Sequence, residues 1–252
     1  MQSINVSQLK TWAIEHPNPR VRKLFVIAKR SRTAELPTIP FLNALLYHTY
    51  SMVKNMLSEI ARMLIHTPAF KGRALKCGKR LYLYTGVPYI SGPLTIRVGD
   101  DCRISGQTTF TGRSSSKSPT LEIGNNVGIG WQTTIAVGSK VIINDNVRIA
   151  GRAGLYGYPG HPLDASDRAA GKADTEQQIG DICLERDVWL ANNVSVMAGV
   201  TIGQGTIVAA GSIVTKDLPP YVLAGGNPAK VIKSLNKEEL HNQLCNEIQE
   251  VS

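Results

Sequence analysis

A chain of 252 residues that is 42% hydrophobic is long enough to bury a substantial core, and its aromatic content of only 6% predicts a core of stacked aliphatic side chains. Four widely separated cysteines without a CxxC pair argue against a disulfide framework, and the lack of an 18-residue uncharged apolar run argues against a membrane-spanning helix. The net charge of +9 is concentrated at one end, because residues 1–80 hold 14 of the 28 Lys and Arg but only three of the 19 Asp and Glu. This end suits an anionic partner, such as a lipid head group or a phosphorylated intermediate, or it is a solvated basic surface.

Residues 1–80 are expected to be helical. Apolar residues recur at helical spacing over residues 21–28, and after two prolines a second amphipathic stretch covers residues 41–66. Charged residues interrupt its apolar stripe, which therefore lies on a surface. Two interpretations stay open: packing against the body or a neighbouring subunit, and peripheral contact with a membrane. The sequence starts without the apolar core of a signal peptide, so we expect a cytoplasmic protein, with any membrane contact at the inner face of the cytoplasmic membrane.

From Val98 onward the chain repeats with a period of six residues. Each repeat has an apolar residue at one position, often followed by Gly or Ala, and a small or β-branched residue four positions later. The apolar positions are Val98, Ile104, Phe110, Ile123, Ile129, Ile135, Ile143, Ile149, Leu155, Leu184, Leu190, Val196, Ile202, Val208 and Val214. This period fits neither an α-helix nor a hairpin, but it fits a solenoid whose triangular coils carry one repeat on each side. With three repeats to a coil, we expect a mainly β fold, a parallel β-helix of about five coils.

The repeat divides the chain into three parts. We expect a basic helical extension over residues 1–80, the β-helix over residues 81–233, and a short C-terminal helix over residues 234–252, with Asn236 as its cap and Glu239 three residues on. A long loop, residues 156–180, interrupts the repeat. Such loops often form the binding face of a solenoid, which makes this one the candidate catalytic loop.

Several motifs resemble those of a known family. GHPLD (residues 160–164) lies in the long loop, DVWLANN (187–193) and AGVTIGQGTIVAAGSIVTKDLPP (198–220) lie in the repeats, and GGNPAKVIK (225–233) follows them. Together they resemble the hexapeptide-repeat acyltransferases, in the branch of maltose and galactoside O-acetyltransferases, over roughly residues 94–233. The resemblance implies a left-handed β-helix, a homotrimer, and acetyl-CoA as the acetyl donor with no metal required.

His161 is the candidate general base. Acetyl transfer to a hydroxyl needs a base for the proton, a donor for the developing oxyanion and a site for coenzyme A. His161 is the single histidine of the repeat region and lies in the long loop. An imidazole, with its ordinary pKa of about 6.5, suits proton transfer near neutral pH. The resemblance assigns the oxyanion donor to the backbone amide of Asn192.

The same resemblance implies residues for the two substrates. The coenzyme A residues are Trp189, Ala210, Thr215, Lys216, Lys230 and Lys233, where the ammonium groups serve as point charges for phosphates. The acceptor residues that we expect are Gln132, Tyr156, Tyr158 and Asp164. One departure from the family stands out: its acceptor-binding Asn and Asp fall here at about Gln132 and at Val137 or Gly138. The missing carboxylate argues against a simple galactoside or maltose as the acceptor.

We therefore expect an acetyl-CoA-dependent O-acetyltransferase that modifies a sugar hydroxyl in the synthesis of a surface polysaccharide (O-antigen, capsule or exopolysaccharide), since the helical extension resembles that of enzymes with this role. The acceptor is free, nucleotide-linked or lipid-linked, and the sequence also leaves open a longer acyl donor and N-acetylation of an amino sugar or sugar nucleotide. A non-catalytic trimeric scaffold with a basic docking arm is the alternative of another class. A zinc carbonic anhydrase would need three histidine ligands, and nucleic-acid binding lacks a recognised motif.

Overall fold

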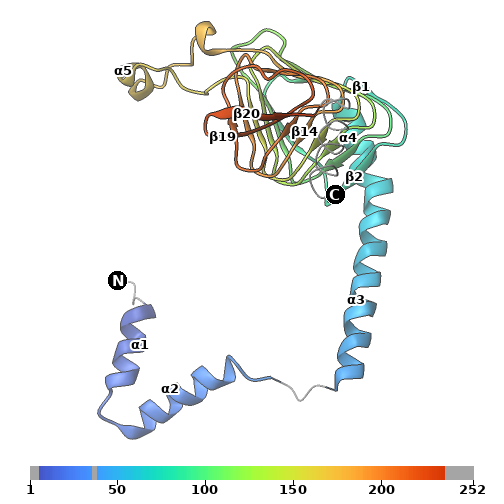
Figure 1. The fold of residues 1–252 in the computed structure, drawn as a ribbon. Helices are drawn as coiled ribbons and strands as arrows, with labels where there is room; N and C mark the ends of the chain where they lie inside the picture. The colour runs from blue at the N-terminus through green and yellow to red at the C-terminus, as the bar shows by residue number, and fades with distance from the viewer. Residues whose placement is uncertain (1–5, 36–38, 236–252) are drawn as a thin grey trace, which may run out of the picture. The chain divides into compact units, whose positions relative to one another are not determined.

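The computed structural model describes residues 6–35 and 39–235 of the chain. The chain divides into two compact units, Met1–Asn55 and Met56–Ser252, and all the described strands belong to the second (Figure 1). The C-terminal helix expected over residues 234–252 lies almost wholly outside the described residues.

The helices begin with α1 (Val6–Glu15) and α2 (Pro19–Ser31). The Asn18 side chain accepts a hydrogen bond from the Arg20 amide at 2.9 Å, and Pro19 takes the first helical position, where a backbone donor would have no helical partner. α3 (Pro40–Ala61) continues through a π-helical turn (Arg62–His66) into α4 (Thr67–Arg73), so helical structure runs beyond the predicted residue 66. None of the described helices is long and apolar enough to cross a bilayer.

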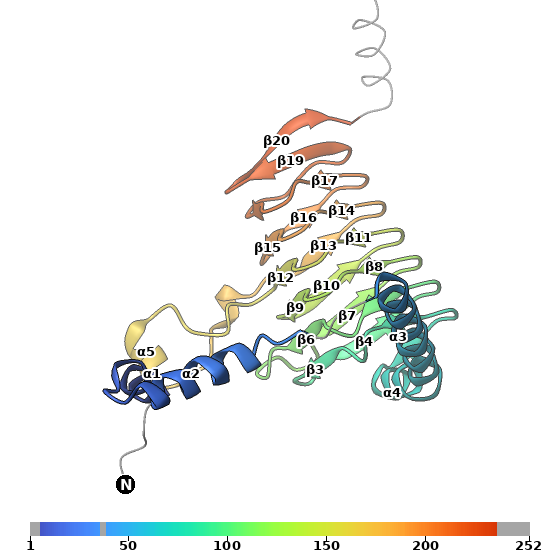
Figure 2. The same cartoon turned by 90° about the horizontal axis from the view of Figure 1, so that it is seen from below.

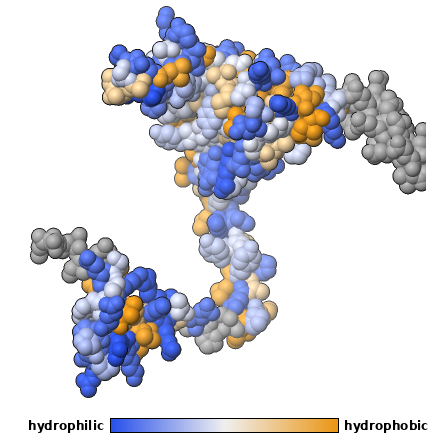
Figure 3. Space-filling model, turned by 60° about the vertical axis from the view of Figure 1, so that its left-hand side comes forward, coloured by the Kyte–Doolittle hydropathy of each residue, from blue (hydrophilic) through white to orange (hydrophobic). Residues whose placement is uncertain are grey.

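Large apolar side chains on α2 and α3 are exposed. They include Leu24, Val26, Ile27, Phe41, Leu46 and Met56. Figure 3 shows orange hydrophobic patches between blue hydrophilic ones on the helical part of the chain. Because an exposed apolar surface of this kind usually marks an interaction site, these helices are candidates for contact with a partner or a membrane.

Three parallel sheets, which we name A, B and C, form the walls of a triangular prism (Figure 2). Sheet A holds β1 (Lys76–Cys77), β4 (Thr95–Val98), β7 (Thr120–Ile123), β10 (Lys140–Ile143), β13 (Ile182–Leu184) and β16 (Thr201–Ile202). Sheet B holds β2 (Tyr82–Tyr84), β5 (Arg103–Ser105), β8 (Gly128–Ile129), β11 (Arg148–Ile149), β14 (Trp189–Leu190), β17 (Ile207–Val208), β19 (Val222–Gly226) and β20 (Ala229–Ser234). Sheet C holds β3 (Tyr89–Ser91), β6 (Thr109–Gly112), β9 (Thr134–Val137), β12 (Gly154–Tyr156), β15 (Ser195–Met197) and β18 (Ile213–Val214).

The interior of the prism is the predicted aliphatic core. Every apolar position of the six-residue repeat is buried, from Val98 to Val214. At the corners, the chain turns through left-handed backbone conformations at Asn126 and Asn193, as expected for asparagine in tight turns. The predicted parallel β-helix is confirmed.

The predicted number of coils is too low. The strands complete six coils, and a seventh begins with a bridge between Ile202 and Leu218 and with β19. The six-residue repeat does not reveal the first coil. Its inward positions are Cys77, Leu83 and Ile90, so a cysteine stands in place of an aliphatic residue and the step from Leu83 to Ile90 is seven residues. Of the strands of this coil, only β1 lies within the helical extension expected over residues 1–80, while β2 and β3 lie in the residues assigned to the β-helix.

An element outside the parallel coils lies at each end of the prism. Phe70 of α4 is fully buried and belongs to the same core cluster as Leu81 and Leu83 of the first coil. At the other end β20 pairs antiparallel with β19, whereas every other pairing in the prism is parallel among the described residues. The long loop leaves the prism between β12 and β13 and contains a short helix, α5 (Ala165–Ala169), and a 3-10 turn (Glu176–Gln178).

Candidate functional site

His161 lies on the long loop at the corner between sheets C and A. Its side chain is exposed and lines a pocket of about 590 Å³. The walls of this pocket come from the ends of β3 and β6 and from the loop itself, and they include Thr111, Tyr158 and Lys172. The loop thus returns to the first two coils and leaves room for a ligand beside the imidazole.

A buried arginine fastens this loop to the prism. Arg113 follows β6, and its Nε donates to Asp174 Oδ1 at 2.6 Å, with only 4% of each side chain exposed. Its Nη2 donates to the Asp174 carbonyl oxygen at 2.8 Å, and its Nη1 donates to Glu176 Oε1 at 2.7 Å. A charge this deeply buried is tolerated only when paired and hydrogen-bonded, and here the pairing spans 61 residues of chain.

The same contacts hold the backbone on both sides of His161. The Gly160 amide donates to Asp174 Oδ2 at 3.1 Å, so the carboxylate bound by Arg113 also fixes the residue before the histidine. The Gln178 side-chain amide donates to the carbonyl oxygen of His161 at 3.1 Å. The backbone at His161 is therefore held from the 3-10 end of the loop.

Asp164, expected near the acceptor, acts as a helix cap. Its carboxylate accepts hydrogen bonds from the amides of Ser166 and Asp167, both at 2.9 Å, at the start of α5. The Ser166 hydroxyl and these amides hold the pKa of the Asp164 carboxyl below its usual value. The sequence motif GHPLD thus combines a candidate base with the residue that shapes the helix after it.

The other expected acceptor residues are spread over two corners. The Tyr158 hydroxyl lies 3.1 Å from Thr111 Oγ1 in the pocket of His161. Tyr156 is exposed on β12, where its ring covers Gly154: a Cβ there would come within 2.4 Å of the ring. Gln132 lies instead at the corner between sheets B and C, and its Oε1 accepts from Arg152 Nε at 3.0 Å.

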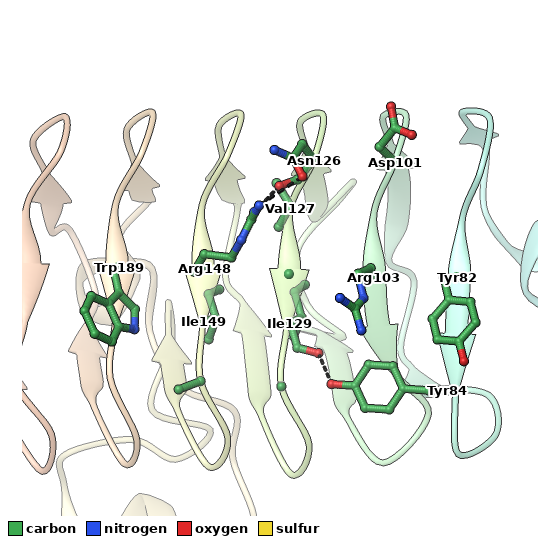
Figure 4. Close-up of a pocket in the computed structure, with 13 residues that line it drawn as sticks. Tyr82, Tyr84, Asp101, Arg103, Asn126, Val127, Ile129, Arg148, Ile149 and Trp189 are labelled. Atoms are coloured by element: carbon green, nitrogen blue, oxygen red, sulfur yellow. Dashed lines mark hydrogen bonds between the residues drawn. The ribbon is translucent and has the colours of Figure 1, made fainter.

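The expected oxyanion residue and two of the expected coenzyme A residues lie elsewhere on the prism. Asn192 and Ala210 occupy successive turns between sheets B and C, where the Gly211 amide donates to the Asn192 carbonyl oxygen at 2.9 Å. Trp189 is 49% exposed on the outer face of sheet B and lines a second pocket, of about 560 Å³ (Figure 4). One chain therefore does not bring Trp189 and His161 into one pocket.

The remaining coenzyme A residues surround the C-terminal coils. Thr215 and Lys216 are exposed after β18, at the corner between sheets C and A, which is the corner of the His161 loop. Lys230 and Lys233 are exposed on β20. The predicted set is thus divided between the corner of His161 and the face of Trp189.

Comparisons with known proteins agree with this architecture. Residues 184–216 match the family described as bacterial transferase hexapeptide (six repeats). The chain is 40% identical over 120 residues to the Saccharomyces cerevisiae protein YJL218W and 38% identical over 121 residues to the galactoside O-acetyltransferase of Escherichia coli. The β-helix is similar to the hexapeptide-repeat transferases. These alignments cover 47% and 48% of this chain and 58% and 57% of the relatives, so the chain spans little more than half the length of the proteins it matches.

A solved structure is similar to this chain in its fold. AntD, an N-acyltransferase from Bacillus cereus in complex with dTDP and coenzyme A, superposes with a TM-score of 0.53 at 20% identity. The match covers 73% of this chain and 97% of AntD. At this identity the comparison shows the shared fold.

Two sets of charged residues in this chain were not predicted from its sequence. Arg113 and Asp174 lie outside the repeat positions, and neither stands in a motif, so only the fold reveals them as partners. Arg103 and Arg148 each stand one residue before a repeat position, and the alternation of a strand could have placed them outward on one sheet. Among the described residues, no group of His, Cys, Asp and Glu could hold a metal ion.

Proposed function

We propose that this chain is an acetyl-CoA-dependent O-acetyltransferase that modifies a sugar hydroxyl, with His161 as the general base. The observation that carries the proposal is the fixed His161 loop beside an open pocket, in a chain homologous to a galactoside O-acetyltransferase. The acceptor hydroxyl loses its proton to the imidazole while its oxygen attacks the thioester carbonyl. The amide of Asn192 donates to the oxyanion, and the intermediate then collapses to the acetyl ester, with the coenzyme A thiolate leaving and taking up the proton from His161.

The complete site needs two copies of the chain. Because His161 and Trp189 line different pockets of one prism, a site that uses both is built from the loop corner of one copy and the sheet B face of a neighbour. A ring of three copies closes such a heterologous contact and gives three equal sites. We therefore include the homotrimer in the proposal, with Trp189, Ala210, Thr215, Lys216, Lys230 and Lys233 along the coenzyme A.

The helical part supports a location near anionic lipid. α2 holds Arg20, Arg22, Lys23, Lys29 and Arg30, no acidic residue, and exposed Leu24 and Ile27. Basic and apolar side chains on one short helix are typical of peripheral contact with an anionic membrane. A membrane at the cytoplasmic face is where the lipid-linked acceptor of a surface-polysaccharide pathway would be met.

The test is release of coenzyme A from acetyl-CoA with a panel of hydroxyl and amino sugars. We expect the wild-type protein to acetylate a hydroxyl acceptor and His161→Ala to lose roughly 10²- to 10⁴-fold in kcat, the usual contribution of a general base. His48→Ala, on the exposed surface of α3, is the matched control and should keep full activity. Full activity of His161→Ala would show that another group is the base, and activity on amino sugars alone would make the chain an N-acetyltransferase.

A further inference from the structure

The outer face of sheet B carries an aligned row of five residues. Register pairs Tyr82 with Arg103, Arg103 with Gly128, Gly128 with Arg148, and Arg148 with Trp189, so these positions stack along the prism. All five line the pocket of about 560 Å³ (Figure 4). Strands in a sheet lie about 4.8 Å apart, so the row is about 19 Å long and forms an extended groove.

Two arginines occupy the middle of this groove. Gly128 stands between them, and its lack of a side chain makes room for Arg148, because a Cβ on Gly128 would come within 3.3 Å of the Arg148 side chain. Arg148 is held in place by Asn126, whose Oδ1 accepts from Nη2 at 3.0 Å and whose carbonyl oxygen accepts from Nη1. The Arg103 guanidinium lies 5.8 Å from the centre of the Tyr82 ring.

The acidic groups near the groove already have partners. Asp101 binds Arg80, with a distance of 2.7 Å between Asp101 Oδ2 and Nη2. Glu59 is paired with Arg62 at 2.7 Å. Neither Arg103 nor Arg148 forms an ion pair with a carboxylate in the part of the chain that the structure describes. The groove therefore presents two uncompensated positive charges.

Aromatic rings flank these charges on both sides. Trp189 stands at one end of the row, and Tyr82 and Tyr84 stack at the other with ring centres 6.4 Å apart. The Tyr84 hydroxyl donates to the Ile129 carbonyl oxygen at 3.1 Å, which fixes that ring against the middle strand. Flat rings accept the apolar faces of sugar rings, and arginine forks bind carboxylate and phosphate oxygens.

The groove begins at Trp189, which the proposed function places along the coenzyme A, and extends away from the other coenzyme A residues. Ala210, Lys216, Lys230 and Lys233 belong to the coils on the C-terminal side of Trp189, whereas the groove runs from Trp189 towards the N-terminal coils. A ligand in the groove would thus extend towards the N-terminal coils, with Trp189 where it meets the coenzyme A.

We infer that this face of sheet B is the acceptor groove and that it binds an acidic oligosaccharide, with Arg103 and Arg148 on its carboxylate or phosphate groups and Trp189 and Tyr84 against its sugar rings. The inference rests on the proposed function for the identity of the reaction, and it names the substrate class. An acidic acceptor also agrees with the absence of the carboxylate that the family uses for neutral sugars.

Calorimetric titration of the full-length protein tests the inference without requiring turnover. The probes are an oligogalacturonate for carboxylate, glucose 1-phosphate for phosphate, and maltotriose as the neutral control, each with a parallel titration of coenzyme A. We expect at least one acidic probe to bind tighter than maltotriose and to weaken as salt is raised. Arg103→Gln/Arg148→Gln should lower that affinity at least tenfold and leave the affinity for coenzyme A unchanged.

Arg97→Gln is the matched control, because Arg97 is an exposed arginine on sheet A of the same coil as Arg103. It should bind all probes as the wild type does. Since Arg148 also holds a turn, Arg103→Gln alone and Arg148→Lys are measured beside the double variant, with Arg148→Lys expected to retain part of the affinity. Equal binding of acidic and neutral probes, no binding of either acidic probe, or unchanged binding in the double variant overturns the inference. Failure of coenzyme A to bind would instead count against the proposed function.

Discussion

Arg113 and Asp174 form a buried ion pair that joins the second coil of the β-helix to the far end of the His161 loop, with 2.6 Å between Nε and Oδ1. The second oxygen of the same carboxylate accepts from the amide of Gly160, the neighbour of the candidate base. The arrangement makes the histidine's position depend on a residue that is 48 positions earlier in the sequence.

Asp174→Asn should therefore loosen the loop. An unpaired buried charge costs roughly 3–5 kcal/mol, but in this variant Arg113 keeps its contact with the exposed Glu176, so we expect the free energy of unfolding to fall by less than that. We expect faster tryptic cleavage in the loop at Arg168 and Lys172, and a fall in kcat with little change in the affinity for coenzyme A. Chemical denaturation, limited proteolysis and kinetics measure the three effects.

Lys172→Ala is the control for that experiment. It removes an exposed ion pair with Asp167, 2.7 Å long, in the same loop. Exposed pairs contribute under about 1 kcal/mol, so the unfolding free energy should hardly change. Equal losses in both variants would mean that the buried pair has no special part in holding the loop.

Mixing of inactive chains tests whether the site is shared. His161→Ala and Trp189→Ala should each be nearly inactive as homotrimers. If one copy supplies the histidine and its neighbour supplies the tryptophan, trimers reassembled from equal amounts should regain about a quarter of the wild-type activity, the chance that a random interface has both residues intact. Activity that stays at the level of the single variants would place both residues in one chain's site.

The cap of α5 should make the loop sensitive to acid. Hydrogen bonds from Ser166 and Asp167 lower the pKa of Asp164 in the folded protein. A carboxyl whose pKa is lower when folded stabilises the fold above its unfolded value, and this contribution disappears as the pH falls through the lowered value. Hydrogen exchange of residues 165–169 should therefore accelerate in strong acid relative to the intrinsic rate.

The substitution Asp164→Asn removes the titrating charge of the cap and keeps a side chain that can accept the same hydrogen bonds. Asparagine caps helices without titrating, so the variant should keep α5 and lose the acid-dependent step, whereas Asp164→Ala should expose these amides at every pH. An acid step that persists in Asp164→Asn would assign it to another group.

Membrane contact through α2 can be measured by pelleting with phosphatidylglycerol-containing vesicles and with phosphatidylcholine vesicles. Each basic residue near an anionic surface contributes about 1 kcal/mol, so Arg22→Glu/Lys23→Glu should strongly reduce pelleting. Arg97→Glu/Arg152→Glu, at two exposed positions of the prism, changes the net charge by the same amount and is the control. Equal pelleting of both variants, or no preference for anionic vesicles, would contradict peripheral contact through this helix.

The sequence predicts the prism well because its information is periodic. Each apolar repeat position from Val98 onward points inward for the same steric reason, so one rule places them all. The first coil breaks that rule at Cys77 and in the seven-residue step from Leu83 to Ile90, and it was missed.

The site was harder to predict because its contacts are not periodic. His161 could be singled out from its motif, but its support by Arg113 depends on how the loop folds back, which no local pattern encodes. Spacing likewise gave no sign that Asn192 and His161 lie at different corners of the triangle. That division follows only from the order of the sheets.

The antiparallel hairpin of β19 and β20 bears on how copies of the chain can assemble. An open parallel edge could recruit identical strands and lengthen into a fibre, and proteins commonly prevent this with lysines on the outermost strand. β20 carries Lys230 and Lys233. At the opposite end, Phe70 of α4 packs into the core of the first coil. Growth along the axis is thus discouraged at both termini of the solenoid, which leaves lateral association as the route to an oligomer.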